Sequence, residues 1–166
     1  MKWFSALMCA AALSSLALLP AQASGLSKDD ASYLTTTMQT QLGRYALATL
    51  AVKNAHSPKI KAFAKALASD ASAQTMRLDA MAKHYGVPVT KHPDVRASYH
   101  YSQLSDLHGS QFDRRFIQDL QIGDSVSAEQ QSAEARNGSD AALKKYAQQR
   151  LQLLNREQSH LGSLNA

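Results

Sequence analysis

LAVKNAHSPKIKAFAKALASDAS, residues 50–72, contains the turn that decides the fold. Ser57 is a natural helix N-cap, and Pro58 fits the first turn of a helix, where its missing N–H costs nothing. Apolar residues then recur at three- and four-residue steps, which is typical of one face of a helix; they are Ile60, Phe63, Ala64, Leu67 and Ala71. The stretch therefore predicts two long antiparallel helices joined by a tight turn.

The same periodicity extends on both sides of this turn. Before it, residues 31–56 predict one helix whose apolar face consists of Leu34, Met38, Leu42, Tyr45, Thr49 and Val52. After it, the second helix continues to Gly86, a favourable C-terminal stop. The segment GVPVTKHP, residues 86–93, has two prolines and no periodicity, so we interpret it as a crossover connection over the end of a bundle.

The second half of the chain predicts one short and two long helices. The short helix covers about residues 95–107 and is broken at His108 and Gly109. A long helix follows over about residues 111–136, and the last helix begins after a cap at Ser139 or Asp140. No strand-like alternation is present. The pattern predicts an all-α fold, a four-helix bundle with one extra short helix in the crossover region, in a single domain of residues 24–166.

The first residues have the features of a secretory signal peptide. Lys2 supplies a short positive region, residues 3–19 form an apolar run, and Pro20 precedes the small-x-small site at residues 21–23. The apolar run is short for a bilayer span of about 20 residues, which disfavours an uncleaved anchor. We predict that residues 1–23 are removed before Ser24 and that the protein is periplasmic, with outer-membrane association left open.

The composition of residues 24–166 limits the classes of partner that we expect for the protein. It has no cysteine, because Cys9 lies in the leader, so stability must come from a packed core. Without Lys2, 17 basic and 13 acidic side chains remain, a net charge of +4. This balance suits anionic envelope polymers or lipid head groups, although dispersed charge also serves solubility. We predict an unidentified envelope component or protein as partner and no nucleic acid, and leave peripheral membrane association and oligomerisation open.

No catalytic template is present: the chain has no glycine-rich phosphate loop, no Gly-x-Ser-x-Gly and no His-x-x-x-His. We therefore predict that it is not an enzyme. His84, His92, His100 and His108 recur every eight residues. Eight helical residues climb about 12 Å, so the last two cannot share a metal if both are helical. The first two flank the proline-rich segment, where either a surface Cu(II) or Zn(II) site or ordinary solvated histidines would fit.

Residues 50–72 and the later GSQFDRRF, residues 109–116, resemble the exported bacterial helical-bundle family catalogued as domain of unknown function 4142. The resemblance covers nearly the whole mature chain and implies a ferritin-like bundle in the outer membrane or periplasm. It also implies a Glu on the first long helix and a His on each of the other three. Such inward-facing ligands would suit a transition metal.

The residues at these four positions all differ from the family pattern; they are Arg44, Ala71, Asp124 and Glu157. Asp70 retains the acid before the second-helix His, whereas Gly123 stands where the third helix would have one. His160 lies about one turn beyond the fourth position. A guanidinium repels a cation and cannot be deprotonated.

We therefore predict no cofactor and a buried polar cluster in which Arg44 pairs with Asp124, Glu157 or both. One alternative is that these are three unrelated polar residues at helix edges, because Arg44 lies at the margin of the predicted apolar face. The other is a transition-metal site formed by Asp70, Asp124, Glu157 and His160. The predicted function is a non-enzymatic binding or structural role in the cell envelope or its stress response, with periplasmic metal binding as the alternative.

One aspartate and three tyrosines receive structural interpretations. Phe112 and Asp113 match the family's Phe-Asp pair, and Asp113 is predicted to favour the start of its own helix through the helix dipole. Tyr99, Tyr101 and Tyr146 would suit a glycan-binding pocket, but their spacing favours core or interface positions.

Overall fold

The computed structural model describes residues 25–88 and 91–164, and this part of the chain contains five helices and no strand. They are α1 (Lys28–Asn54), α2 (Pro58–Tyr85), α3 (Val95–Ser105), α4 (Gly109–Asn137) and α5 (Ala141–Leu164). The four long helices and the short α3 confirm the predicted all-α bundle. The predicted signal peptide and its cleavage site lie outside the described residues. None of the described helices is long and apolar enough to cross a membrane.

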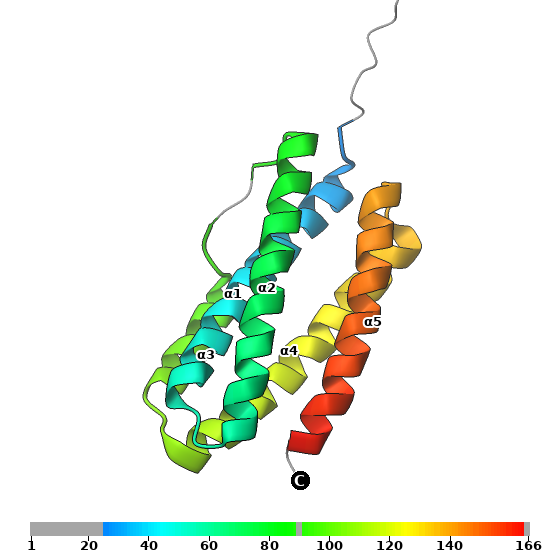
Figure 1. Ribbon diagram of the computed structural model, residues 1–166. Helices are drawn as coiled ribbons and strands as arrows, with labels where there is room; N and C mark the ends of the chain where they lie inside the picture. Colours follow the sequence, from blue (N-terminus) through cyan, green and yellow to red (C-terminus); the bar gives the residue numbers. More distant parts are fainter. Residues whose placement is uncertain (1–24, 89–90, 165–166) are drawn as a thin grey trace, which may run out of the picture.

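The long helices form two antiparallel hairpins, α1 with α2 and α4 with α5 (Figure 1). The hairpins meet through α1 and α4, whereas α2 and α5 make few contacts with each other. Because α2 and α4 run in the same direction, the chain must return along the bundle before α4 begins (Figure 1). The short α3 makes part of this return along the side of the bundle, whereas the sequence predicted a crossover over its end (Figure 1). Residues 89–90 of the predicted crossover segment lie outside the described residues.

Local caps account for several helix ends. Gly86 ends α2 in the left-handed conformation (φ 67°), which glycine adopts without strain. Asp140 begins α5 by accepting hydrogen bonds from the N–H groups of Ala142 and Leu143, each at 2.9 Å. Of the two predicted caps, Ser139 and Asp140, the structure therefore uses the aspartate.

The start of α2 is capped differently from the prediction. Ser57 occupies the N-cap position, but its side chain makes no capping hydrogen bond. Instead, the Asp113 carboxylate accepts hydrogen bonds from the N–H groups of His56 and Ser57, each at 2.8 Å. Asp113 lies beyond the first turn of α4, which begins at Gly109. Its predicted role at the start of its own helix is wrong: it ties the α1–α2 turn to α4.

Two apolar clusters fill the bundle. The first surrounds the α1–α2 turn and includes Leu47, Ala51, Ile60, Leu67, Phe112, Phe116 and Leu161. The second lies toward the other end and includes Leu34, Met38, Leu78, Leu143 and Tyr146. Buried polar residues separate the clusters along α1, α4 and α5; they are Gln41, Arg44, Asp124 and Arg150. Each large apolar side chain contributes about 1.5–3 kcal/mol on burial, but the middle of the bundle is polar.

The buried face of α1 is rotated from the predicted one. Tyr45 and Val52 are exposed (46% and 37%), although the periodicity placed both on the apolar face. The helix instead buries Thr37, Gln41 and Arg44 among its apolar residues. A hydrophobic pattern cannot mark a buried face whose middle is polar, which explains the error.

The tyrosines divide between core and surface. Tyr146 is in the core, as predicted. Tyr99 and Tyr101 are exposed on α3, so neither is in the core, and an interface position for them stays a prediction. The short α3 buries only Leu104 and therefore offers no core position to either ring.

Candidate functional site

The middle of the bundle contains a three-residue ion-pair cluster. Arg44 of α1 is 5% exposed. Its Nη1 donates a hydrogen bond to Oδ1 of Asp124 on α4, and its Nη2 donates to Oε1 of Glu157 on α5. Asp124 is fully buried. The structure thus brings Arg44 together with both acids, which is the pairing that the sequence predicted.

The charges of the three side chains in this cluster compensate one another. Burial raises the pKa of Asp124 and Glu157, and the charge of Arg44 counteracts this effect. Burial alone would lower the pKa of Arg44, but the two carboxylates raise it. An unpaired ion in a protein interior costs several kcal/mol. The guanidinium therefore supplies the positive charge that these carboxylates would otherwise take from a bound cation or a proton.

A second buried arginine lies on α5, the helix that also carries Glu157. Arg150 of α5 is 2% exposed, and its Nη1 donates to Oδ2 of Asp70 on α2 at 2.6 Å. Its Nη2 lies 4.0 Å from Oε2 of Glu157, too far for a hydrogen bond. Among the described residues, Nε and Nη2 of Arg150 have no hydrogen-bond partner. Arg150 was missed in the sequence, although it stands on the apolar stripe of α5 between Ala147 and Leu154.

The proposed metal ligands do not fit a metal in this arrangement. Asp124 and Glu157 bind Arg44, and Asp70 binds Arg150. A cation at their centre would have to displace a guanidinium, which carries a fixed charge. His160 is at the surface, with its ring edge-on to Phe63 at 5.3 Å. Within residues 25–88 and 91–164, no three His, Cys, Asp or Glu side chains are placed to hold a metal ion.

The regularly spaced histidines have separate environments. His84 packs edge-on against Tyr85, with 4.8 Å between the ring centroids. His100 of α3 faces α4, where its Nδ1 lies 3.2 Å from Oδ2 of Asp119. His108 precedes α4 at its N-cap position without a side-chain capping bond. His84 and His100 therefore contact different neighbours, on α2 and on α4.

Two surface grooves lie along the sides of the bundle. The α2–α5 groove has a volume of about 910 Å³ and includes Asp70, Arg150, Glu157 and His160 in its lining. Three residues of the alternative metal set therefore share one surface feature, together with a buried arginine. The second groove lies between α1, α3 and α4, measures about 560 Å³ and is mainly apolar.

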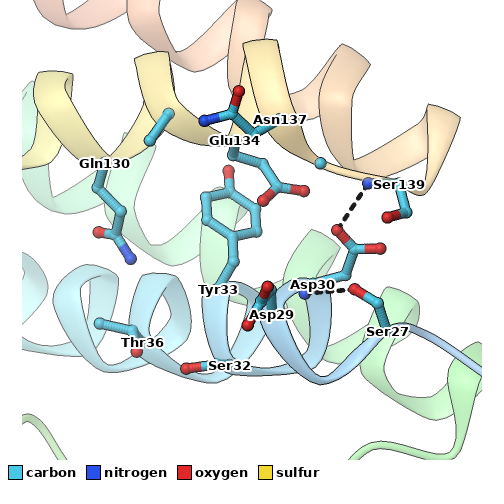
Figure 2. A pocket seen from close by; sticks show the side chains of 12 residues that line it. Ser27, Asp29, Asp30, Ser32, Tyr33, Thr36, Gln130, Glu134, Asn137 and Ser139 are labelled. Carbon is cyan, nitrogen blue, oxygen red and sulfur yellow. Dashed lines mark hydrogen bonds between the residues drawn. The ribbon is translucent and has the colours of Figure 1, made fainter.

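A smaller hollow of about 310 Å³ lies where α1 begins and α4 ends (Figure 2). Asp30 is buried there and accepts hydrogen bonds from the N–H groups of Ser139 (3.0 Å) and Asp140 (3.1 Å). Figure 2 shows Glu134 directed from α4 toward Tyr33 and Asp30. Burial raises the pKa of Glu134 to about 7, and the nearby Asp30 carboxylate adds to the shift. We call Asp30, Glu134 and Asp140 the acidic end.

The sequence matches the family described as a domain of unknown function, DUF4142, over residues 15–164. The chain therefore belongs to this family, as the resemblance predicted. No match is found among curated proteins.

Several solved structures share the fold. A DUF305 fragment from Deinococcus radiodurans has a TM-score of 0.76 at 13% identity and covers 85% of this chain and 98% of its own. CopM in its Cu(I)-bound form has a TM-score of 0.68 at 15% identity and covers 81% of this chain and 93% of its own. The Ag-bound form of CopM has a TM-score of 0.66 at 17% identity, with the same coverage. At these identities the likeness shows the bundle fold alone.

Proposed function

We propose that this chain is an exported, non-catalytic binding protein of the cell envelope that works through its surface grooves. The observation that carries the proposal is the position of Arg44 between Asp124 and Glu157. A guanidinium stands where the family resemblance would place a metal centre, so the interior is balanced in charge without a cation. We therefore place ligand binding in the grooves at the surface of the bundle.

Two further observations support this proposal. The N-terminal sequence has the pattern of a cleaved export signal, which directs the mature chain to the envelope. The α2–α5 groove, at about 910 Å³, falls within the range of roughly 300–1,000 Å³ that small-molecule sites occupy. The sequence has no recognisable nucleophile motif, and its polar centre consists of mutually paired charges.

Cell fractionation with intact-mass measurement tests the export step. We expect the protein in the periplasmic fraction, with a mass that corresponds to a chain beginning at Ser24. Full-length protein that stays in the cytoplasm would contradict the proposal. A variant with Lys2→Glu and Leu16→Arg, which damages the leader without touching the mature chain, is the matched control and should accumulate at full length.

Metal binding is the second candidate, because CopM shares the fold and has been solved with bound copper and silver. In this chain, Asp70, Glu157 and His160 line the same groove. Titration with Cu(I), Cu(II) and Zn(II) distinguishes the candidates when it is repeated on Asp124→Ala and His160→Ala. Saturable binding that both substitutions abolish would favour the metal site. Surface binding unaffected by Asp124→Ala would leave the buried cluster without a metal role.

A further inference from the structure

The hollow at the acidic end has carboxyl groups but no basic side chain in its lining. It lies where α1 begins and α4 ends, and its volume is about 310 Å³ (Figure 2). Asp29 and Asp30 of α1 and Glu134 of α4 line it. Among the described residues that line it, none is a lysine, an arginine or a histidine. A cleft with charges of one sign concentrates ions of the opposite sign, so this hollow favours a cation.

The carboxyl groups in the hollow lack the counter-charge that Arg44 supplies in the middle of the bundle. Asp30 is held as a carboxylate by the N–H groups of Ser139 and Asp140. Glu134 is 7% exposed, and Figure 2 shows it directed toward Asp30. Within the described residues, Oε1 of Glu134 has no hydrogen-bond partner. Neighbouring carboxyl groups resist ionising together, so either a proton or a bound cation must balance the charge of Glu134.

Asp29 makes the site accessible from solvent. Its side chain is exposed, and it forms no hydrogen bond or ion pair with another described residue. It lines the same hollow as the buried Asp30 and Glu134. A cation that enters the hollow therefore meets one free carboxylate at the surface before it reaches the buried pair.

The remaining lining favours an organic cation over a metal ion. Hydroxyl and amide groups that accept N–H hydrogen bonds line the hollow; they belong to Ser27, Ser32, Thr36, Gln130 and Asn137. Tyr33 and Ala133 add apolar surface. Within residues 25–88 and 91–164, no three His, Cys, Asp or Glu side chains are placed to hold a metal ion. Small-molecule sites begin at roughly 300 Å³, so the hollow suits a short molecule with its own N–H donors.

We propose that this hollow binds a small primary aliphatic amine as its ammonium ion. The ammonium group has three N–H donors and lies between the carboxylates of Glu134 and Asp29. It takes the place of the proton on Glu134, which is released to solvent. The alkyl part lies against Tyr33 and Ala133. The hollow is separate from the two grooves, so this inference goes beyond the proposed function and does not depend on a ligand in either groove.

Binding should depend on pH through Glu134. The charged and titratable groups around it are Asp29, Asp30 and Tyr33 of α1, Asp140 and Lys144 at the start of α5, and Tyr85 of α2, which binds Asp140. Burial and the neighbouring carboxylates raise the pKa of Glu134 to about 7, and Lys144 counteracts them. Primary ammonium groups, with pKa values of about 10, keep their charge near neutral pH. The ligand binds the ionised carboxylate, so affinity should rise about tenfold from pH 6 to pH 8.

Isothermal titration with 1,4-diaminobutane at these two pH values tests the inference on the untagged protein. The decisive variant is Glu134→Gln, which keeps the shape of the side chain and removes its charge. Its control is Glu129→Gln, the same substitution at an exposed acid of α4 outside the hollow. We expect saturable wild-type binding, weakened about tenfold by Glu134→Gln and unchanged by Glu129→Gln. Asp29→Asn, at an exposed position without a side-chain partner, should weaken binding about threefold.

Several outcomes would overturn the inference. One is the absence of saturable binding, and another is an equal effect of the two glutamine substitutions. Binding with the same affinity at both pH values would remove the role of Glu134. Equal binding of the neutral analogue 1,4-butanediol would remove the role of charge, and tighter binding of Ca²⁺ would indicate a metal site instead. The proposed function fails separately, through cytoplasmic retention or stoichiometric metal on isolation, so a negative titration removes only this site.

Discussion

The bundle neutralises buried carboxylates in two ways. In the middle, Asp124 and Glu157 share the guanidinium of Arg44. At the acidic end, Asp30 is held by backbone N–H groups, and Glu134 lies beside it. Within the described residues, no arginine forms an ion pair with any of the three acids of the acidic end.

The two regions differ in how their charge responds to pH. A fixed guanidinium keeps its charge at all physiological pH values, so the middle cluster has a permanent counter-charge. Backbone N–H groups stabilise only the carboxylate that they bind, and its neighbour Glu134 then holds its proton up to a pKa of about 7. We therefore expect the middle cluster to fix the packing of the helices and the acidic end to respond to pH.

Removing Arg44 should have the largest effect. Arg44→Met leaves two carboxylates buried without a counter-charge, so we expect the free energy of unfolding to fall by about 3–5 kcal/mol. Urea denaturation at neutral pH measures this loss. Arg114→Met, at an exposed arginine of α4, is the control and should cost little. Joint replacement with Asp124→Leu and Glu157→Leu should restore most of the stability; a loss below 1 kcal/mol on the single change would contradict the cluster's role.

Asp30 is the structural anchor of the acidic end. Asp30→Asn retains the shape but leaves one acceptor oxygen for two backbone N–H groups, so we expect a loss of about 1.5–3 kcal/mol in unfolding free energy. The exposed neighbour Asp29 offers the control, Asp29→Asn. Thermal denaturation of both variants at one pH is sufficient. Equal stability of the two would show that the α4–α5 turn does not depend on Asp30.

Glu134 should make stability pH-dependent. Its pKa is about 7 in the fold against an ordinary 4.5, so between these values the folded state binds more protons than the unfolded state. The free energy of unfolding should therefore fall as pH rises through this window, by on the order of 1–2 kcal/mol. Glu134→Gln should remove this slope, whereas Glu129→Gln, on the exposed side of α4, should retain it. Denaturation at pH values across the window distinguishes the two.

The smallest expected effect concerns the glycine before Asp124. A Cβ at Gly123 would meet no atom within 4 Å, so Gly123→Ala should raise the free energy of unfolding by about 0.5–1 kcal/mol. At Gly43 of α1, the added Cβ would lie 2.5 Å from that of Ala97, so Gly43→Ala should instead displace α3 and destabilise the protein. Thermal denaturation of both variants checks the opposite signs. Destabilisation by Gly123→Ala would indicate that the segment before the middle cluster requires glycine.

The sequence was sufficient to predict the helices, because several ends coincide with a strong local signal such as Pro58, Gly86 or Asp140. The pairing of Arg44 with both acids was also predictable, but only through the family resemblance, which placed three distant positions at one level of the bundle. Spacing alone put Arg44 at a helix margin and Tyr45 inside. The polar side chains at the middle of α1 conceal its buried face from any hydrophobic pattern.

The remaining site residues depend on contacts between distant segments. Asp113 caps a turn 56 residues earlier in the chain, and Asp30 binds backbone groups 109 residues later. No local pattern shows such partners. Arg150 was within reach, since a charged residue on the apolar stripe of α5 requires a partner of opposite charge, and the half-buried Asp70 on α2 supplies it.

Elemental analysis of untagged protein isolated from the periplasm, followed by titration with copper, zinc and iron, tests the central claim most directly. The claim is that Arg44 stands in place of a metal ion in the middle of the bundle. The account predicts less than stoichiometric metal on isolation and no saturable binding that depends on Asp124. Stoichiometric metal that disappears in Asp124→Ala would contradict it and would make the cluster a metal centre.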